Sequence, residues 1–109
     1  MMARKTKVVG DGLQNTLKCD KCGHGLQVTT PWSELIYMSM RRLPTNNSWL
    51  HDPHSGCFVP NTRCPRCGDP VRLGLTPDEC ARHIKSGVLG GKIREADVAT
   101  YAQRIAGGG

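Results

Sequence analysis

Apolar positions recur with helical spacing in three segments of the chain, and the first of these follows Thr30-Pro31. Its members are Trp32, Leu35, Ile36, Met40 and Leu43. Residues three or four apart share one face of a helix. Thr30 can cap this helix, and Pro31 suits its first position, where the missing N–H of proline costs nothing. The pattern predicts a helix that starts after Thr30 and stops at Pro44.

The strongest helix signal is the run Thr76-Pro77-Asp78-Glu79. A threonine at the N-cap with a glutamate three residues later forms a capping box, and proline is favoured at the first helical position. We therefore predict a helix over residues 76–86, with Gly87 as its C-terminal stop.

A third helix is predicted over residues 95–105. Its apolar face consists of Val98, Tyr101, Ala102 and Ile105. Isolated helices of this length are marginal in water, and this face is small. We expect the helix to dock on a partner chain, or only loosely on its own domain.

The rest of the chain predicts less regular structure. Residues 1–17 are polar and basic, and we expect an extended basic arm there. A short strand is predicted over residues 26–29. Residues 44–63 carry three prolines and a glycine, which is typical of a loop that needs something to order it.

Composition shows why a metal site would matter. The chain has 109 residues, of which 38% are hydrophobic, with two Trp, two Tyr and one Phe. A core this thin is marginal, and small domains often need a metal or disulfides to fold.

Eight potential metal ligands form four pairs that share one spacing. The pairs are Cys19/Cys22, His54/Cys57, Cys64/Cys67 and Cys80/His83. A glycine follows the second cysteine in two of them, which is typical of a tight knuckle turn. Eight ligands would build two closed tetrahedral sites, so the pattern predicts two structural zinc ions.

Disulfides are the rival use of the six cysteines. The N-terminus has basic residues but no apolar segment of a signal peptide, and no apolar run is long enough to span a membrane. A reducing, cytoplasmic location is therefore expected, where paired cysteines favour metal binding. Incorporation into a virion would still allow oxidation.

The four pairs can combine in three ways. In a sequential arrangement, Cys64/Cys67 and Cys80/His83 share one ion, and Cys19/Cys22 shares the other with His54/Cys57. This resembles zinc fingers and treble clefs, in which a knuckle leads to a ligand-bearing helix. In a cross-brace, which is similar to RING-type and FYVE-type domains, Cys19/Cys22 and Cys64/Cys67 share one ion, and His54/Cys57 and Cys80/His83 share the other.

The third possibility is a single zinc ribbon that uses only the two knuckles. Cys57, Cys80 and His83 would then be ordinary residues, Cys80 as a small apolar side chain of its helix. Within the second pair, His51 competes with His54 as the ligand, and the spacing favours His54. The resemblance to zinc-knuckle, zinc-ribbon and treble-clef-like proteins covers the knuckles and extends to no single family over the whole chain.

These elements predict a small α+β zinc-stabilised domain with two knuckles, short strands and about three short helices. We expect the arm at 1–17, the zinc-binding domain at 18–87, and a C-terminal helix with a glycine tail at 88–109.

The functional classes follow from the same residues. Closed thiolate sites argue against catalysis, which needs an open metal position or an activated nucleophile, so we expect no enzyme. We favour a structural or adaptor subunit of a larger assembly, for example a phage virion, tail or baseplate complex. The alternative is a zinc-ribbon protein that binds DNA or RNA, because the formal net charge is +6 and the basic residues can face phosphates.

Overall fold

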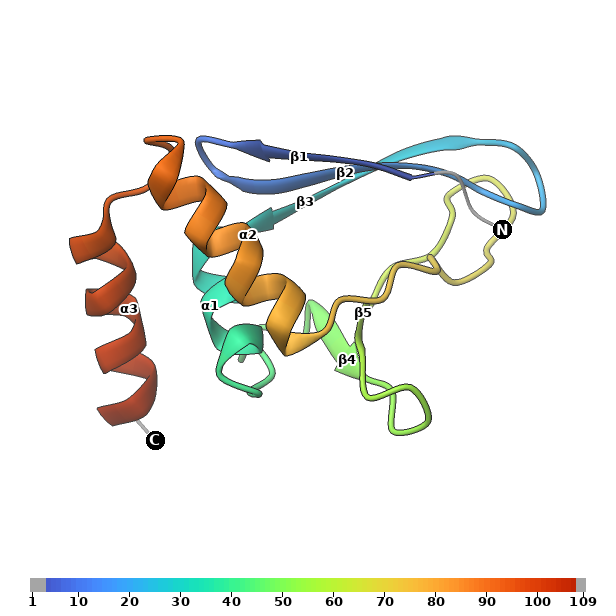
Figure 1. Cartoon of the computed structure of the whole chain (residues 1–109). Coiled ribbons are helices and arrows are strands. Elements are labelled where there is room, and N and C mark those ends of the chain that lie inside the picture. The colour runs from blue at the N-terminus through green and yellow to red at the C-terminus, as the bar shows by residue number, and fades with distance from the viewer. Residues whose placement is uncertain (1–3, 108–109) are drawn as a thin grey trace.

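Three antiparallel strands form the sheet on which the first two helices pack (Figure 1). Strands β1 (Arg4–Val9), β2 (Gly12–Lys18) and β3 (Gly25–Pro31) lie side by side in chain order. The computed structural model describes residues 4–107. Together with three helices, the sheet confirms the predicted α+β class.

The N-terminal segment differs from the expected arm, because residues 4–18 pair as a β-hairpin. Leu13, Asn15 and Leu17 point from β2 into the core and are at most 2% exposed. The residues between them are polar, so β2 alternates with the period of two that a half-buried strand requires. That alternation was the available signal for a strand here.

Helix α1 (Trp32–Ser39) begins one residue later than expected. Pro31 occupies the N-cap position without a side-chain cap, whereas Thr30 still belongs to β3 and pairs with Leu13. The helix ends at Ser39 rather than near Pro44. Leu43, assigned to the apolar stripe, lies beyond the helix and is 43% exposed.

Helix α2 (Pro77–Leu89) confirms the predicted capping residue. The Oγ1 atom of Thr76 accepts a hydrogen bond of 3.1 Å from the backbone N–H of Glu79. Gly87 lies inside the helix, so its expected role as a stop was wrong. A Cβ at Gly87 would clash with Cη2 of Trp32. The glycine is therefore required for close packing of α2 on the indole.

Helix α3 (Glu95–Gly107) packs beside α1 (Figure 1). Ile105 is 6% exposed, and Val98 and Ala102 are partly buried against the core. Nη1 of Arg42 donates a 2.7 Å hydrogen bond to the carbonyl oxygen of Ile105. The predicted apolar face is thus covered in part by this chain's own α1.

The loop-like region after α1 contains a second, two-stranded sheet made of β4 (Trp49–His51) and β5 (Phe58–Pro60). Trp49 is 3% exposed, and its Nε1 donates a 3.1 Å hydrogen bond to Oε1 of Glu34 on α1. This contact fastens the small sheet to the helical layer.

A single apolar cluster joins the sheet, the helices and β5. It includes Leu13, Leu35, Met38, Leu73, Leu75 and Cys80, each at most 1% exposed. Within residues 4–107, no helix has both the length and the apolar character that crossing a membrane requires.

Candidate metal centre

The first knuckle is the turn that joins β2 to β3. The backbone N–H of Cys19 donates to the carbonyl of His24, and the N–H of Gly23 donates to the carbonyl of Cys19, both at 2.9 Å. Gly23 has a φ of 74°, a left-handed conformation that residues with a Cβ rarely adopt. The glycine therefore closes the turn and brings Cys19 and Cys22 to the same side.

The second knuckle repeats this geometry in a different segment. The N–H of Cys64 donates to the carbonyl of Asp69 at 2.7 Å, and the N–H of Gly68 donates to the carbonyl of Cys64 at 2.8 Å. Gly68 has a φ of 80°. Two turns of the same construction therefore present two cysteines each.

The two knuckles face one another, and their four sulfur atoms lie within 4.8 Å of each other. Sγ of Cys19 is 3.6 Å from Sγ of Cys67, and Sγ of Cys22 is 3.6 Å from Sγ of Cys64. Four thiolates bound to one zinc at about 2.3 Å in a tetrahedron would stand roughly 3.8 Å apart. The observed separations fit a zinc site with four cysteine ligands.

The environment of the sulfurs favours metal binding. Backbone amides of Cys22 and Lys21 lower the pKa of Cys19. The amides of Cys67 and Arg66, working against burial, lower the pKa of Cys64 to about 7. Thiolates are the species that bind zinc.

The other two sulfurs hold their protons more tightly. At Cys67 the amide of Asp69 favours the thiolate, but burial and the neighbouring thiols raise the pKa to about 12. The pKa of Cys22 is also raised: the amide of His24 lowers it, but burial and the thiols of Cys64 and Cys19 outweigh that amide. Four negative sulfurs repel one another, so a divalent cation is the natural partner of the set.

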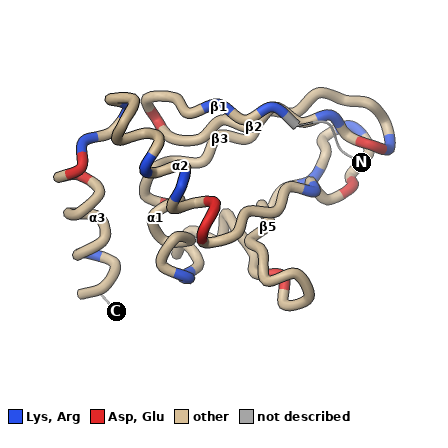
Figure 2. Tube along the Cα trace, viewed as in Figure 1, with Lys and Arg blue, Asp and Glu red and all other residues tan. Residues whose placement is uncertain are grey.

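Basic and acidic positions both occur along the chain at the knuckles (Figure 2). Nζ of Lys21 in the first knuckle lies 3.4 Å from Oδ1 of Asp69 beside the second. Nη1 of Arg63 donates a 3.1 Å hydrogen bond to the carbonyl of Gly68. These contacts link and brace the turns that carry the cysteines.

All six cysteines are free thiols, so the disulfide alternative was wrong. Within residues 4–107, the four knuckle cysteines are the one group of at least three His, Cys, Asp or Glu residues close enough to hold a metal ion. The expected second zinc site is therefore not seen.

The pairing also differs from the sequential arrangement, because Cys64 and Cys67 meet Cys19 and Cys22 instead of Cys80 and His83. Cys80 is fully buried in the apolar cluster, where burial raises its pKa to about 12. His83 lies half-buried one turn further along α2. Cys80 fits the expectation of an apolar helix residue.

The His54/Cys57 pair lies in an exposed turn between β4 and β5. Oδ1 of Asp52 accepts a 3.0 Å hydrogen bond from the backbone N–H of His54. The half-buried thiol of Cys57 donates to the carbonyl of Ser55 at 3.8 Å. The ring of His51, the competing ligand, packs edge-on against Phe58 at a centroid distance of 5.6 Å.

The pairing of Cys19/Cys22 with Cys64/Cys67 is the one expected for the single ribbon and for the first site of the cross-brace. The second site of the cross-brace is not seen in residues 4–107, so the arrangement matches the single ribbon. In the structure, Cys80 and Ile84 lie four residues apart on α2 and are both buried. A buried cysteine at helical spacing behaves as a small apolar residue. No family model, curated protein or solved structure matches the chain.

Proposed function

We propose that the chain is a non-enzymatic structural subunit, in which one zinc ion stabilises a small scaffold that acts as an adaptor in a larger assembly. The observation that supports this proposal is the closed set of four sulfurs within 4.8 Å. Catalytic zinc keeps a position open for water or substrate, whereas four protein thiolates fill the tetrahedron.

A metal ion at this place would act as a cross-link. Cys22 and Cys64 lie 42 residues apart in sequence, and the segment between them contains α1 and the small sheet. One ion would thus connect the turn of the main sheet to the segment that leads into α2. Zinc binding would thereby contribute to folding free energy.

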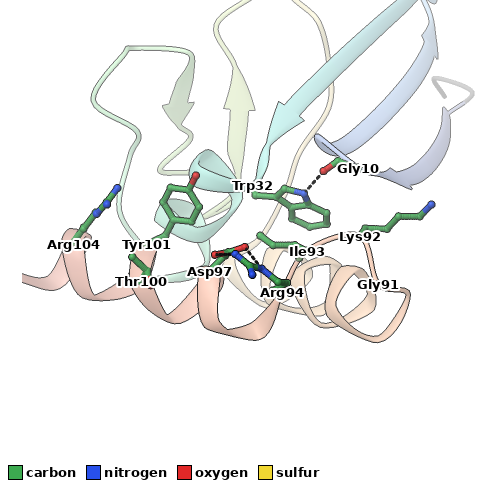
Figure 3. Close-up of a pocket in the computed structure, with 10 residues that line it drawn as sticks. All are labelled: Gly10, Trp32, Gly91, Lys92, Ile93, Arg94, Asp97, Thr100, Tyr101 and Arg104. Carbon is green, nitrogen blue, oxygen red and sulfur yellow. Dashed lines mark hydrogen bonds and ion pairs between the residues drawn. The ribbon is translucent and has the colours of Figure 1, made fainter.

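The surface beside α3 has features suited to a protein partner. A pocket of about 480 Å³ lies between the β1–β2 turn and α3, and Tyr101 and Arg104 project from α3 toward it (Figure 3). Leu89, at the end of α2, is 79% exposed. Aromatic and arginine side chains are enriched at protein interfaces.

Cobalt substitution tests the structural role of the metal. We expect the purified chain to bind one Co²⁺ with the strong sulfur-to-metal absorption of a tetrahedral thiolate site. Added azide or cyanide should leave the spectrum unchanged, because no position is open. A spectrum that shifts with these anions would refute the closed site.

Partner binding requires a separate test. The tagged full chain would be cross-linked in its native organism, and its contacts mapped by mass spectrometry. Leu89→Ser and Tyr101→Ala should remove cross-links to one defined protein, while zinc content stays at the wild-type level. Leu50→Ser is the matched control, because Leu50 is also an exposed leucine, at 48%. Equal contacts in all variants would contradict an adaptor surface beside α3.

A further inference from the structure

The face of the main sheet that points away from the helices is open (Figure 1). The strand alternation places polar side chains there, and we call this surface the open sheet face. Its polar residues are Lys5, Lys7, Gln14, Thr16, Lys18, Gln27 and Thr29, all exposed except the half-buried Gln14. The opposite face carries Leu13 and Leu17, which are buried in the core.

This face carries positive charge without compensation. None of the three strands contains an aspartate or a glutamate. No ion pair joins Lys5, Lys7 or Lys18 to any other residue in the described range 4–107. Figure 2 shows basic positions along the sheet and at its knuckle end.

The strand register puts the lysines in a row. Lys7 lies opposite Gln14 and Lys5 opposite Thr16, while Lys18 follows two residues beyond Thr16 on β2. Because a strand rises about 3.4 Å per residue, Lys7, Lys5 and Lys18 stand at successive steps of about 7 Å.

We propose that the open sheet face binds the phosphate backbone of a nucleic acid. The three lysines neutralise phosphates, and the glutamine and threonine side chains hydrogen-bond to phosphate or sugar oxygens. No aromatic side chain lies on this face, so base stacking of the kind used by single-strand binders makes no contribution. Binding is therefore directed at the backbone and tolerant of sequence.

This inference goes beyond the proposed adaptor role and does not depend on it. The residues that carry it lie on the sheet, whereas the proposed protein-binding surface lies beside α3. Loss of the cross-links tested by Leu89→Ser would leave nucleic-acid binding intact, and loss of nucleic-acid binding would leave those cross-links intact.

The test is fluorescence anisotropy of the zinc-loaded full chain with a short DNA duplex and a short single-stranded RNA. We expect binding at low salt with a slope of log affinity against log salt of about −2 to −3, which corresponds to three phosphate contacts. The triple variant Lys5→Gln, Lys7→Gln, Lys18→Gln should bind at least about tenfold more weakly. Replacing the same three lysines with arginine should restore binding.

A matched control removes the same charge elsewhere. The variant Arg82→Gln, Lys85→Gln, Lys92→Gln lowers the net charge by the same amount at exposed positions of the helical side, and we expect it to bind within about threefold of the wild type. Thermal unfolding and zinc content verify that every variant is folded.

The two probes distinguish the source of the phosphate, since preference for the duplex assigns DNA and preference for the single strand assigns RNA. Absence of binding to both probes at low salt would overturn the proposal. Equal weakening by the two triple variants would also overturn it, because net charge alone would then explain the effect. Polyglutamate that binds as tightly as the nucleic acids would assign the face to an acidic protein instead.

Discussion

Two regions of the molecule are stabilised by different interactions: the knuckle end, which contains the turns around Cys19–Cys22 and Cys64–Cys67, and the helical end, which contains α1, α2 and α3. At the knuckle end, the residues between the paired cysteines are exposed, and the sulfurs of Cys19 and Cys64 are the buried groups around which the turns close. At the helical end, Leu35, Ile36 and Met38 of α1 are at most 2% exposed and pack in the apolar cluster.

The difference sets how each end should respond to damage. Burial of one large aliphatic side chain contributes about 1.5–3 kcal/mol, and the helical end shares its stability among many such contacts. A structural zinc site concentrates on the order of 10 kcal/mol in four bonds. Loss of one zinc ligand should therefore unfold the knuckle end as a whole. A single substitution in the apolar cluster should lower the stability of the helical end by only a small step.

The largest effect is expected from the loss of one thiolate. Cys64→Ser should lower zinc affinity by at least about a hundredfold, since it removes a ligand from a closed site. Cys57→Ser is the matched control, because Cys57 lies outside the sulfur group and its loss should leave one zinc per chain. Competition with a chromophoric chelator measures both affinities. Loss of zinc from Cys57→Ser would instead support the second zinc site that the sequence predicted.

The second effect is the response to metal removal. After chelation, the amides of Gly23 and Gly68, which donate to the carbonyls of Cys19 and Cys64, should exchange hydrogen rapidly. The amide of Ile84 should keep most of its protection, because that residue is buried in the apolar cluster. Hydrogen exchange resolved by residue gives the comparison. Equal loss of protection in α2 would show that the two ends unfold as one unit.

Local signals explain what the sequence predicted correctly. The cap of α2 and the two turns that together carry the one four-cysteine group each depend on residues within six positions of each other, so a short stretch of sequence is enough to predict them. The α+β class could be predicted from short local patterns of this kind. The helix at 95–105 was located for the same reason, since its apolar face repeats within two turns.

Non-local contacts explain what the sequence did not predict. Nothing near Cys64 shows that its partners are Cys19 and Cys22, because that pairing depends on how the sheet and the later segment meet. The role of Gly87 depends on Trp32, which lies far away in sequence. The spacing of Cys80 and His83 suits a ligand pair and a buried helix face equally, and only packing decides between them.

The third effect concerns thiol chemistry at the two ends. Burial raises the pKa of Cys80 to about 12, so at pH 8 only about one molecule in ten thousand carries the reactive thiolate. This fraction rises with pH. In the zinc-loaded protein, iodoacetamide should modify the half-buried Cys57 first and leave Cys80 unmodified until the protein unfolds. Peptide mass spectrometry would detect rapid labelling of Cys80, which would contradict its burial.

The fourth effect tests the packing of the helical end. Gly87→Ala would place a methyl group against the Trp32 ring, and overpacking of this kind costs about 1–3 kcal/mol. The gain in helix propensity of about 1 kcal/mol offsets only part of that cost. We expect a Tm lower by several degrees with zinc affinity unchanged. Gly107→Ala is the control, since nothing lies within 4 Å of a Cβ at that position.

A second substitution makes this test specific. Trp32→Phe removes the outer ring atoms that a Cβ at Gly87 would meet. The double variant Gly87→Ala, Trp32→Phe should therefore be less destabilised than the sum of the two single variants. Additive losses would mean that Gly87 is needed for another reason.

The smallest effects are expected from one exposed ion pair at each end. Lys21 and Asp69 join the two knuckles at 3.4 Å, and Arg94, which precedes α3, meets Asp97 in its first turn at 3.0 Å. Exposed pairs of this kind contribute about 0–1 kcal/mol and weaken with salt. Asp69→Asn should therefore reduce zinc affinity less than tenfold, and Asp97→Asn should lower the Tm by a few degrees at most.

The two ion pairs nevertheless test whether zinc affinity and the thermal stability of the helices are independent. Asp69→Asn should act on zinc affinity and leave α3 unchanged, while Asp97→Asn should act on the thermal stability of the helices and leave zinc affinity unchanged. Measuring both quantities for both variants, at low and high salt, gives four comparisons. An effect of Asp97→Asn on zinc affinity would mean that the helical end transmits strain to the knuckles. The two regions would then have to be treated as one cooperative structure.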